Sequence, residues 1–283
     1  SLYKERSLSE DQSLHEEPKL HYFSTVLKVG DPEPLERIVP FRAPSGVEEA
    51  IYLNGESGDD NNAGSTPETA VRSFDKAKDL AHSKNLKTIY VNGTVTIAGN
   101  NTFVAPGLTL KRFPGFQNYL LSVPKGAELT LQNITLDGSW EAKAVAEKSL
   151  VQCEGTLSIG DGAVLQNNHT LAGKYTLGGA VFCQNGKIQV NGGSIQNNFA
   201  NFGGAIFASN STISLIAGSI QNNTCDPEYK GLGGGIYCEK SAVQLAGSVI
   251  NNNYSTLHGG GIYCGLNTSL NVSGGSVVNN SAG

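Results

Sequence analysis

The sequence predicts an all-β protein that folds as a parallel β-helix, a solenoid whose coils pair edge to edge, with a capping helix near its N-terminus. Two repeated features carry this prediction. A glycine phrase, two glycines followed by small and apolar residues, occurs four times, at Gly178–Cys183, Gly203–Ala208, Gly233–Cys238 and Gly259–Cys264. An asparagine pair occurs five times, at Asn167/Asn168, Asn197/Asn198, Asn222/Asn223, Asn251/Asn252 and Asn279/Asn280, in steps of 30, 25, 29 and 28 residues. Self-similarity at such a period is the signature of a repeat architecture.

The spacing of the two features shows which part of the repeat is constant. From the apolar residue of each glycine phrase to the next Asn pair there are 16, 16, 15 and 17 residues, whereas 14, 9, 14 and 11 residues separate an Asn pair from the next phrase. A constant stretch with one variable corner is typical of a solenoid coil. Two short β-type runs fit inside the constant stretch, for example KIQV and GSIQN. Each coil is therefore predicted to have three strands, and eight or nine coils fit the chain.

The N-terminal part has a different character. Residues 1–49 are charged, carry five of the ten prolines and show no clean periodicity, which indicates a polar linker or extended N-terminal arm. The β-helix is expected over 50–283, with 50–100 as the N-terminal cap and first coil and 150–283 as the clear repeats. The last repeat stops where a further glycine phrase is due, so we expect the native protein to continue.

A helix is predicted from Pro67 to His82, because Thr66 is a good N-cap, proline suits the first helical position, and apolar residues recur on one face. Short strands are predicted before and after it, at Ile51–Leu53, Thr88–Val91, Thr94–Ile97, Leu108–Leu110, Tyr119–Val123, Leu129–Leu131 and Leu157–Ile159.

The glycine phrase is best explained by geometry, because glycine enters backbone conformations that are closed to residues with a Cβ. The Asn pairs are predicted to form ladders of side-chain amides along the solenoid. After each glycine phrase the residues alternate faces, so the aliphatic and aromatic positions are expected to stack on opposite sides. If the aliphatic side is inside, the aromatics form an exposed stripe; otherwise they fill the core. The aromatic set is Phe182, Phe207, Tyr237 and Tyr263.

Four of the five cysteines share one repeat position: Cys153, Cys183, Cys238 and Cys264, with Ala208 in the coil between. Side chains in register on parallel strands point the same way and close a disulfide poorly, so we expect buried free thiols, with disulfides as the alternative. Cys225 lies in the inserted loop of its coil, where a thiol is expected to be accessible.

Composition excludes several classes of function. The formal net charge is −5 and no cluster of Lys and Arg interleaves with aromatics, so nucleic-acid binding is not expected. No apolar run approaches the length of a membrane span, so this segment is not expected to insert into a membrane. The cysteines are a coil apart and no other ligand cluster is present, so neither a metal site nor a cofactor is expected.

The variable corner is the expected place of recognition. Its candidate residues are Asp226, Glu228, Tyr229 and Lys230 of one inserted loop and His258 of the next, and His169 and His258 are expected at equivalent corners. The aromatic stripe is the second candidate binding surface. No catalytic residue is assigned. If the chain were an enzyme, the Asp226 loop with His258 would be its site.

The stretch IYLNGESGDDNNAGSTPETAVRSFDKAKDLA resembles the N-terminal cap of pectin-lyase-like right-handed parallel β-helix proteins of bacterial surfaces. The repeats are similar to β-helix repeats of exported bacterial proteins and, in part, to polymorphic outer-membrane autotransporter adhesins, since GGA(I/V) is present but FxxN occurs only as FCQN and FASN. These resemblances imply a right-handed solenoid in a secreted or cell-surface protein.

The main hypothesis for function is a non-enzymatic adhesin or ligand-binding module that recognises a host surface protein or a glycan, with self-association as a further option. The alternative is a carbohydrate-active β-helix of the polysaccharide lyase or hydrolase kind. A structural stalk is the second alternative, which unequal loops argue against.

Overall fold

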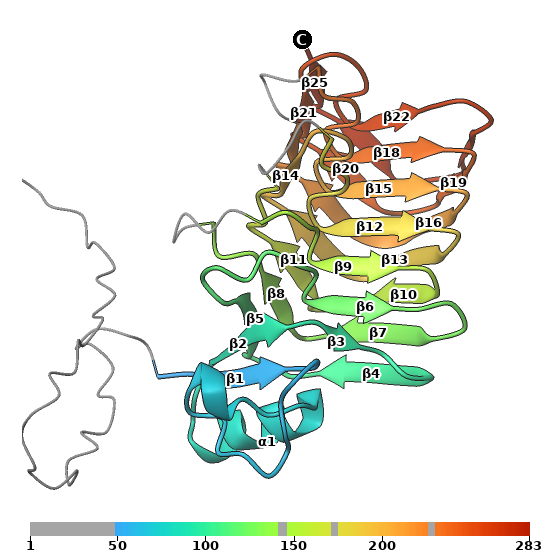
Figure 1. The fold of residues 1–283 in the computed structure, drawn as a ribbon. Helices are drawn as coiled ribbons and strands as arrows, with labels where there is room; N and C mark the ends of the chain where they lie inside the picture. Colours follow the sequence, from blue (N-terminus) through green and yellow to red (C-terminus); the bar gives the residue numbers. More distant parts are fainter. Residues whose placement is uncertain (1–48, 141–145, 171–174, 226–229) are drawn as a thin grey trace, which may run out of the picture. The chain divides into compact units, whose positions relative to one another are not determined.

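The structure is a computed structural model that describes residues 49–140, 146–170, 175–225 and 230–283. Over these residues the chain is a parallel β-solenoid of about six turns with one α-helix, α1 (Phe74–Ser83). Figure 1 shows successive coils stacked as rungs above the helix. The predicted all-β parallel solenoid with a helix on its N-terminal side is confirmed. The eight or nine predicted coils are too many, because α1 and its loops take up much of the N-terminal segment. The predicted arm falls on residues 1–48, outside the described part.

Three parallel sheets run along the solenoid. The 14-stranded sheet contains β1 (Ile51–Asn54), β2 (Thr88–Gly93), β4 (Asn100–Val104), β5 (Thr109–Arg112), β7 (Glu128–Gln132), β8 (Thr135–Asp137), β10 (Thr156–Ile159), β11 (Val164–Gln166), β13 (Lys187–Gln196), β16 (Thr212–Gln221), β19 (Ala242–Leu245), β20 (Val249–Asn251), β23 (Ser269–Val272) and β24 (Ser276–Val278). The seven-stranded sheet contains β3 (Val95–Thr96), β6 (Leu121–Val123), β9 (Val151–Cys153), β12 (Val181–Gln184), β15 (Ile206–Ser209), β18 (Ile236–Glu239) and β22 (Ile262–Cys264). The four-stranded sheet contains β14 (Phe199–Ala200), β17 (Thr224–Cys225), β21 (Tyr254–Ser255) and β25 (Ser281–Ala282).

The helical cap is shorter than predicted and broken in two. Residues Pro67–Thr69 form a 3₁₀ turn, η1, closed by a capping box with Thr66. The chain then becomes extended because Val71, which is fully buried, bridges to Leu53 of β1. Ser73 starts α1 afresh, since its side chain accepts a hydrogen bond from the backbone N–H of Lys76. Burial of one valine against the first strand thus overrides the helical periodicity.

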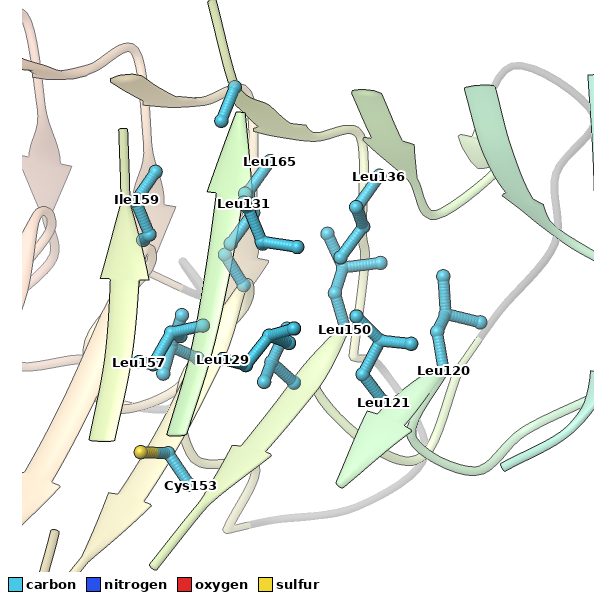
Figure 2. Close-up of a cluster of buried hydrophobic side chains, with 14 of the residues drawn as sticks. Leu120, Leu121, Leu129, Leu131, Leu136, Leu150, Cys153, Leu157, Ile159 and Leu165 are labelled. Carbon is cyan, nitrogen blue, oxygen red and sulfur yellow. The ribbon is translucent and has the colours of Figure 1, made fainter. Parts of the chain in front are cut away.

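Aliphatic side chains fill the interior of the solenoid. Figure 2 shows leucines from strands of different sheets meeting there, with Cys153 beside them. In the seven-stranded sheet Val181, Ile206 and Ile236 pair in register and are fully buried. The aliphatic residue of the glycine phrase therefore faces inward, and this decides between the two alternatives for the aromatic side.

A ladder of asparagine side chains links five coils at one corner. Its members are the buried Asn168, Asn198, Asn223 and Asn253 and the half-buried Asn280. The Oδ1 of Asn223, for example, accepts from the backbone N–H and the Nδ2 of Asn198, both at 3.0 Å. Its own Nδ2 donates to Asn253 Oδ1 and to the carbonyls of Ile195 and Gln221. The side chains thus satisfy backbone groups that have no strand partner at the corner.

The fourth Asn pair lies one residue later than predicted. Ile250 pairs with Ile220, which places Asn252 and Asn253, rather than Asn251 and Asn252, above the pair of the preceding coil. Three consecutive asparagines make this alignment ambiguous in the sequence, and the buried isoleucine resolves it. The first residue of each aligned pair has left-handed backbone, with φ between 53° and 56° for Asn167, Asn197, Asn222, Asn252 and Asn279.

Arg112 closes the N-terminal end of the asparagine ladder. Its side chain is fully buried, and its Nε donates to Asn168 Oδ1 at 3.2 Å. Its two terminal nitrogens donate to the backbone carbonyls of Phe116, Asn118, Lys148 and Ser149. Burial lowers the pKa of Arg112 to about 9, so the guanidinium remains charged at neutral pH. The guanidinium therefore supplies the donor for Asn168 Oδ1, in the place where the other ladder members accept from the asparagine of the preceding coil.

A second amide ladder follows the outer side of the same corner. The Nε2 of Gln221 donates to Gln196, and that of Gln196 donates to Gln166, each at 3.0 Å. Gln166 in turn donates to Asp137 Oδ2 at 2.9 Å. Because each amide donates toward the N-terminus, this ladder needs an acceptor at that end, and the Asp137 carboxylate is that acceptor.

The glycine phrase is confirmed as a geometrical requirement. A Cβ on Gly204 would clash with the carbonyl oxygen of Gly234 in the next coil and would lie 2.8 Å from the backbone nitrogen of Thr224. Gly204, the second glycine of its phrase, is therefore required for the close approach of two coils. The first glycine, such as Gly203 with φ 68°, is required because it adopts left-handed backbone.

We predict that Gly204→Asn lowers the free energy of unfolding by about 3 kcal/mol or more, because the side chain overlaps the backbone of the next coil. Gly107→Asn is the matched control: Gly107 has φ 74° with nothing near its Cβ position. Asparagine tolerates left-handed backbone, so this change stays within about 0.5 kcal/mol. Urea unfolding of both variants measures the difference, and equal losses would contradict the argument.

We predict that Asn223→Ala lowers the free energy of unfolding by about 2–4 kcal/mol, because several buried backbone groups lose their partners at once. The control is Gln221→Ala in the half-buried outer ladder, for which a loss below about 1 kcal/mol is expected. Chemical denaturation measures both. If Gln221→Ala lowered the free energy of unfolding as much as Asn223→Ala does, the inner ladder would contribute no more to stability than the outer one.

Candidate functional site

An aromatic column lies on the outer face of the seven-stranded sheet. It consists of Phe182, Phe207, Tyr237 and Tyr263, which occupy one position in β12, β15, β18 and β22. Their ring centroids are 5.7, 5.1 and 5.3 Å apart, with interplanar angles of 13°, 4° and 16°. The column is therefore a continuous parallel stack along the solenoid.

Stacking changes what the column offers to a ligand. Each inner ring has both faces against its neighbours, and Phe207 is only 8% exposed although it points away from the core. The column thus presents ring edges rather than ring faces along most of its length. Burial and the nearby Glu239 carboxylate raise the pKa of Tyr237 to about 12, and the Tyr237 hydroxyl donates to Glu239 Oε2 at 3.3 Å.

Three further aromatic rings that the sequence reasoning did not single out as site residues border the column. Phe202 meets Tyr237 edge to face at 5.6 Å, and Tyr175 stacks on Phe202 at 6.3 Å with an interplanar angle of 3°. Tyr119 stacks on Phe182 at 6.4 Å. Phe202 holds the position directly before the glycine phrase, which Leu177, Leu232 and His258 occupy in the other coils. Tyr175 and Tyr119 have no such periodic signal. The ring contacts identify them, Tyr119 with Phe182 and Tyr175 with Phe202.

A cleft of about 120 Å³ opens where the column ends on its N-terminal side. We call it the aromatic cleft, and its lining includes Tyr119, Glu147, Lys148, Tyr175, Thr176 and Phe182. Tyr175 is 79% exposed, whereas burial and Glu154 raise the pKa of Tyr119. The cleft therefore combines aromatic rings with one acidic and one basic side chain.

The variable corner lies beside the aromatic cleft. Leu177, Phe202, Leu232 and His258 pair as successive parallel bridges, so the segments that end at them leave the solenoid at one place. Lys230 is exposed and has φ 26°. Asp226, Glu228 and Tyr229, the other candidates of this loop, lie outside the described residues. Their proximity to His258 stays a prediction.

The two histidines do not occupy equivalent corners. His258 pairs with Leu232, whereas His169 pairs with Phe199 at the other end of the variable segment. His169 lies between two rings, 3.8 Å from Trp140 and 5.2 Å from Phe199. Both histidines belong to variable segments, as predicted, but they lie at opposite ends of those segments.

The carboxylates of the repeats are dispersed. Glu154 follows β9, and the corresponding positions in the next three coils are Gln184, Ser209 and Glu239. Three coil spacings separate Glu154 from Glu239 by about 14 Å, too far for them to act as a pair. Among the described residues, no group of three or more His, Cys, Asp and Glu side chains has a geometry that could hold a metal ion.

The cysteine column is confirmed, with two differences from expectation. Cys153, Cys183, Ala208, Cys238 and Cys264 pair in register, and all five cysteines are free thiols. Cys225 is buried rather than accessible, because it lies in β17 and its thiol donates to the carbonyls of Leu232 and Gly233. Cys264 is exposed, and its sulfur accepts from the Cys238 thiol at 3.8 Å.

Fold and surface together define a parallel β-solenoid with an outer aromatic column beside a variable corner. No family model, no curated protein and no solved structure matches this chain. No helix in the described ranges has the length and apolar character needed to cross a membrane.

We predict that iodoacetamide modifies Cys264 alone in the native chain, with a half-maximal rate near pH 7. The hydrogen bond from Cys238 lowers the pKa of Cys264 to about 7, and it raises the pKa of Cys238. Cys238→Ala removes the donor and is expected to move the midpoint toward about 8.5. Mass spectrometry of the modified peptides measures both. Native labelling of Cys225, or an unchanged midpoint in the variant, would contradict this assignment.

Proposed function

We propose that this chain is a non-enzymatic binding module of a secreted or cell-surface adhesin, which recognises a host surface protein or a glycan. The aromatic column with its neighbours at the variable corner is the observation that carries the proposal. Large aromatic side chains that gather on one outer surface are typical of interaction sites, and Tyr is enriched among the residues that dominate binding energy. The corner accepts insertions without disturbing the ladders, so its loops are free to differ from coil to coil.

We further propose that the solenoid is right-handed and belongs with the pectin-lyase-like β-helices of bacterial surfaces. The strand, loop and helix at Ile51–Ser83 and the glycine phrases support this placement. The partial likeness to polymorphic autotransporter adhesins supports a role in adhesion.

A carbohydrate-active enzyme is the competing function. Its candidate carboxylates are Asp226 and Glu228, so Asp226→Asn and Glu228→Gln distinguish the two. An enzyme loses polysaccharide cleavage with these changes, whereas a binding module shows no cleavage before or after them. The full chain is screened against immobilised glycans and purified cell-surface proteins, with cleavage followed on the same samples.

We predict that Tyr237→Ala weakens binding to the partner found in that screen by about tenfold or more, because the ring lies between Phe207 and Tyr263 and contacts Phe202. The control is Tyr52→Ala, in an outer aromatic cluster with Tyr90 and Phe113 at the first coils. Its binding is expected to match the wild type. Thermal unfolding of both variants shows whether the fold persists, and equal binding by both would contradict the role of the column.

A further inference from the structure

We propose that the aromatic cleft binds one hexopyranose ring of a glycan. This inference rests on the proposed binding function and names the ligand and its place. It follows from the end of the aromatic column, from the polar groups at the rim of the cleft, and from the size of the cleft.

The end of a stack differs from its middle. Within the column the inner rings Phe207 and Tyr237 are covered on both faces. The strands before β12 carry Gln152 and Ser122 at the position of Phe182. The regular stack therefore stops at Phe182, where Tyr119 comes in from a different position. Tyr175 covers Phe202 with one face and is otherwise exposed, and it lines the cleft. The cleft is thus where an aromatic face of this surface is open to a ligand.

The polar groups of the cleft divide into two sets. The Ser149 hydroxyl donates to the carbonyls of Leu177 and Gly178, and the Thr176 hydroxyl donates to Asn201 Oδ1 at 2.6 Å. These groups hold the wall in place. The carboxylate of Glu147 and the ammonium of Lys148 then supply an acceptor and a donor for ligand hydroxyls.

A pyranose matches this combination. One side of a pyranose ring is apolar and packs on an aromatic face, while its hydroxyls both donate and accept hydrogen bonds. The volume of 120 Å³ is well below the roughly 300 Å³ at which pockets for drug-sized ligands begin. The cleft is therefore too small for more than one sugar ring, and the rest of a glycan would lie outside it.

The test is saturation-transfer NMR on the full chain with three methyl glycosides: a glucopyranoside, an N-acetylglucosaminide and a galacturonoside. We expect at least one to receive saturation on its ring protons. Tyr175→Ala is expected to weaken this binding by about tenfold, because the stacking face is lost, and Tyr175→Phe to retain it within about threefold. The matched control is Tyr254→Ala, a tyrosine that is 38% exposed in the four-stranded sheet, and it is expected to bind as the wild type does.

Three results would overturn the inference: no glycoside receives saturation, Tyr175→Ala binds as well as the wild type, or Tyr254→Ala loses as much. Failure here is distinct from failure of the proposed function. A chain that binds a surface protein through Tyr237 but takes up no glycoside refutes the sugar in the cleft and leaves the binding module standing.

Discussion

The structure depends on hydrogen bonding between successive coils in strict register. Within the sheets the backbone provides these bonds, but at the corners the chain turns and its N–H groups lose strand partners. The buried asparagines restore them: each amide caps its own turn and the coil beside it. Only the same side chain at the same place in every coil can do this, which is why the Asn pairs and glycine phrases repeat so closely. The described residues of the variable corner carry no such ladder, and the segments there differ in length from coil to coil.

The hydrogen bonds along a ladder of amides all run in one direction, so the amide at its end needs a donor or an acceptor from outside the ladder. In the inner ladder each Oδ1 accepts from the N-terminal side, and at Asn168 the missing donor is the buried Arg112. In the outer ladder each Nε2 donates toward the N-terminus, and Asp137 accepts from Gln166. Two charges of opposite sign thus close two ladders of opposite polarity. Arg112 is tolerated in the interior because its hydrogen bonds to Asn168 and to neutral carbonyls compensate for lost water.

Features that repeat could be predicted from the sequence more completely than features that occur once. The sheets and the cysteine column follow from a period that every coil reinforces. The period left open which face of the glycine-phrase strand is buried, and the packing of Val181 and Ile206 in the core decides it. The break before α1 depends on the burial of Val71 against β1, which helix propensity does not contain. The buried position of Cys225 depends on contacts with Leu232 and Gly233, which have no local signature in the sequence. The cap of the inner ladder joins residues 56 positions apart, Arg112 and Asn168, and has no local signature.

Stacking sets a limit on what an aromatic repeat can bind. A ring that lies between two parallel neighbours has both faces in contact with them. Lengthening the column therefore adds stacking contacts within the fold but no free ring face for a ligand. Recognition by a ring face then requires a ring outside the regular stack. On its N-terminal side the stack stops at Phe182, which Tyr119 covers, and the exposed ring nearby is that of Tyr175, close to where the variable segments leave the solenoid. Under the proposed binding function, the regular part of the repeat therefore holds the surface in place, and the irregular part is where a ligand would be selected.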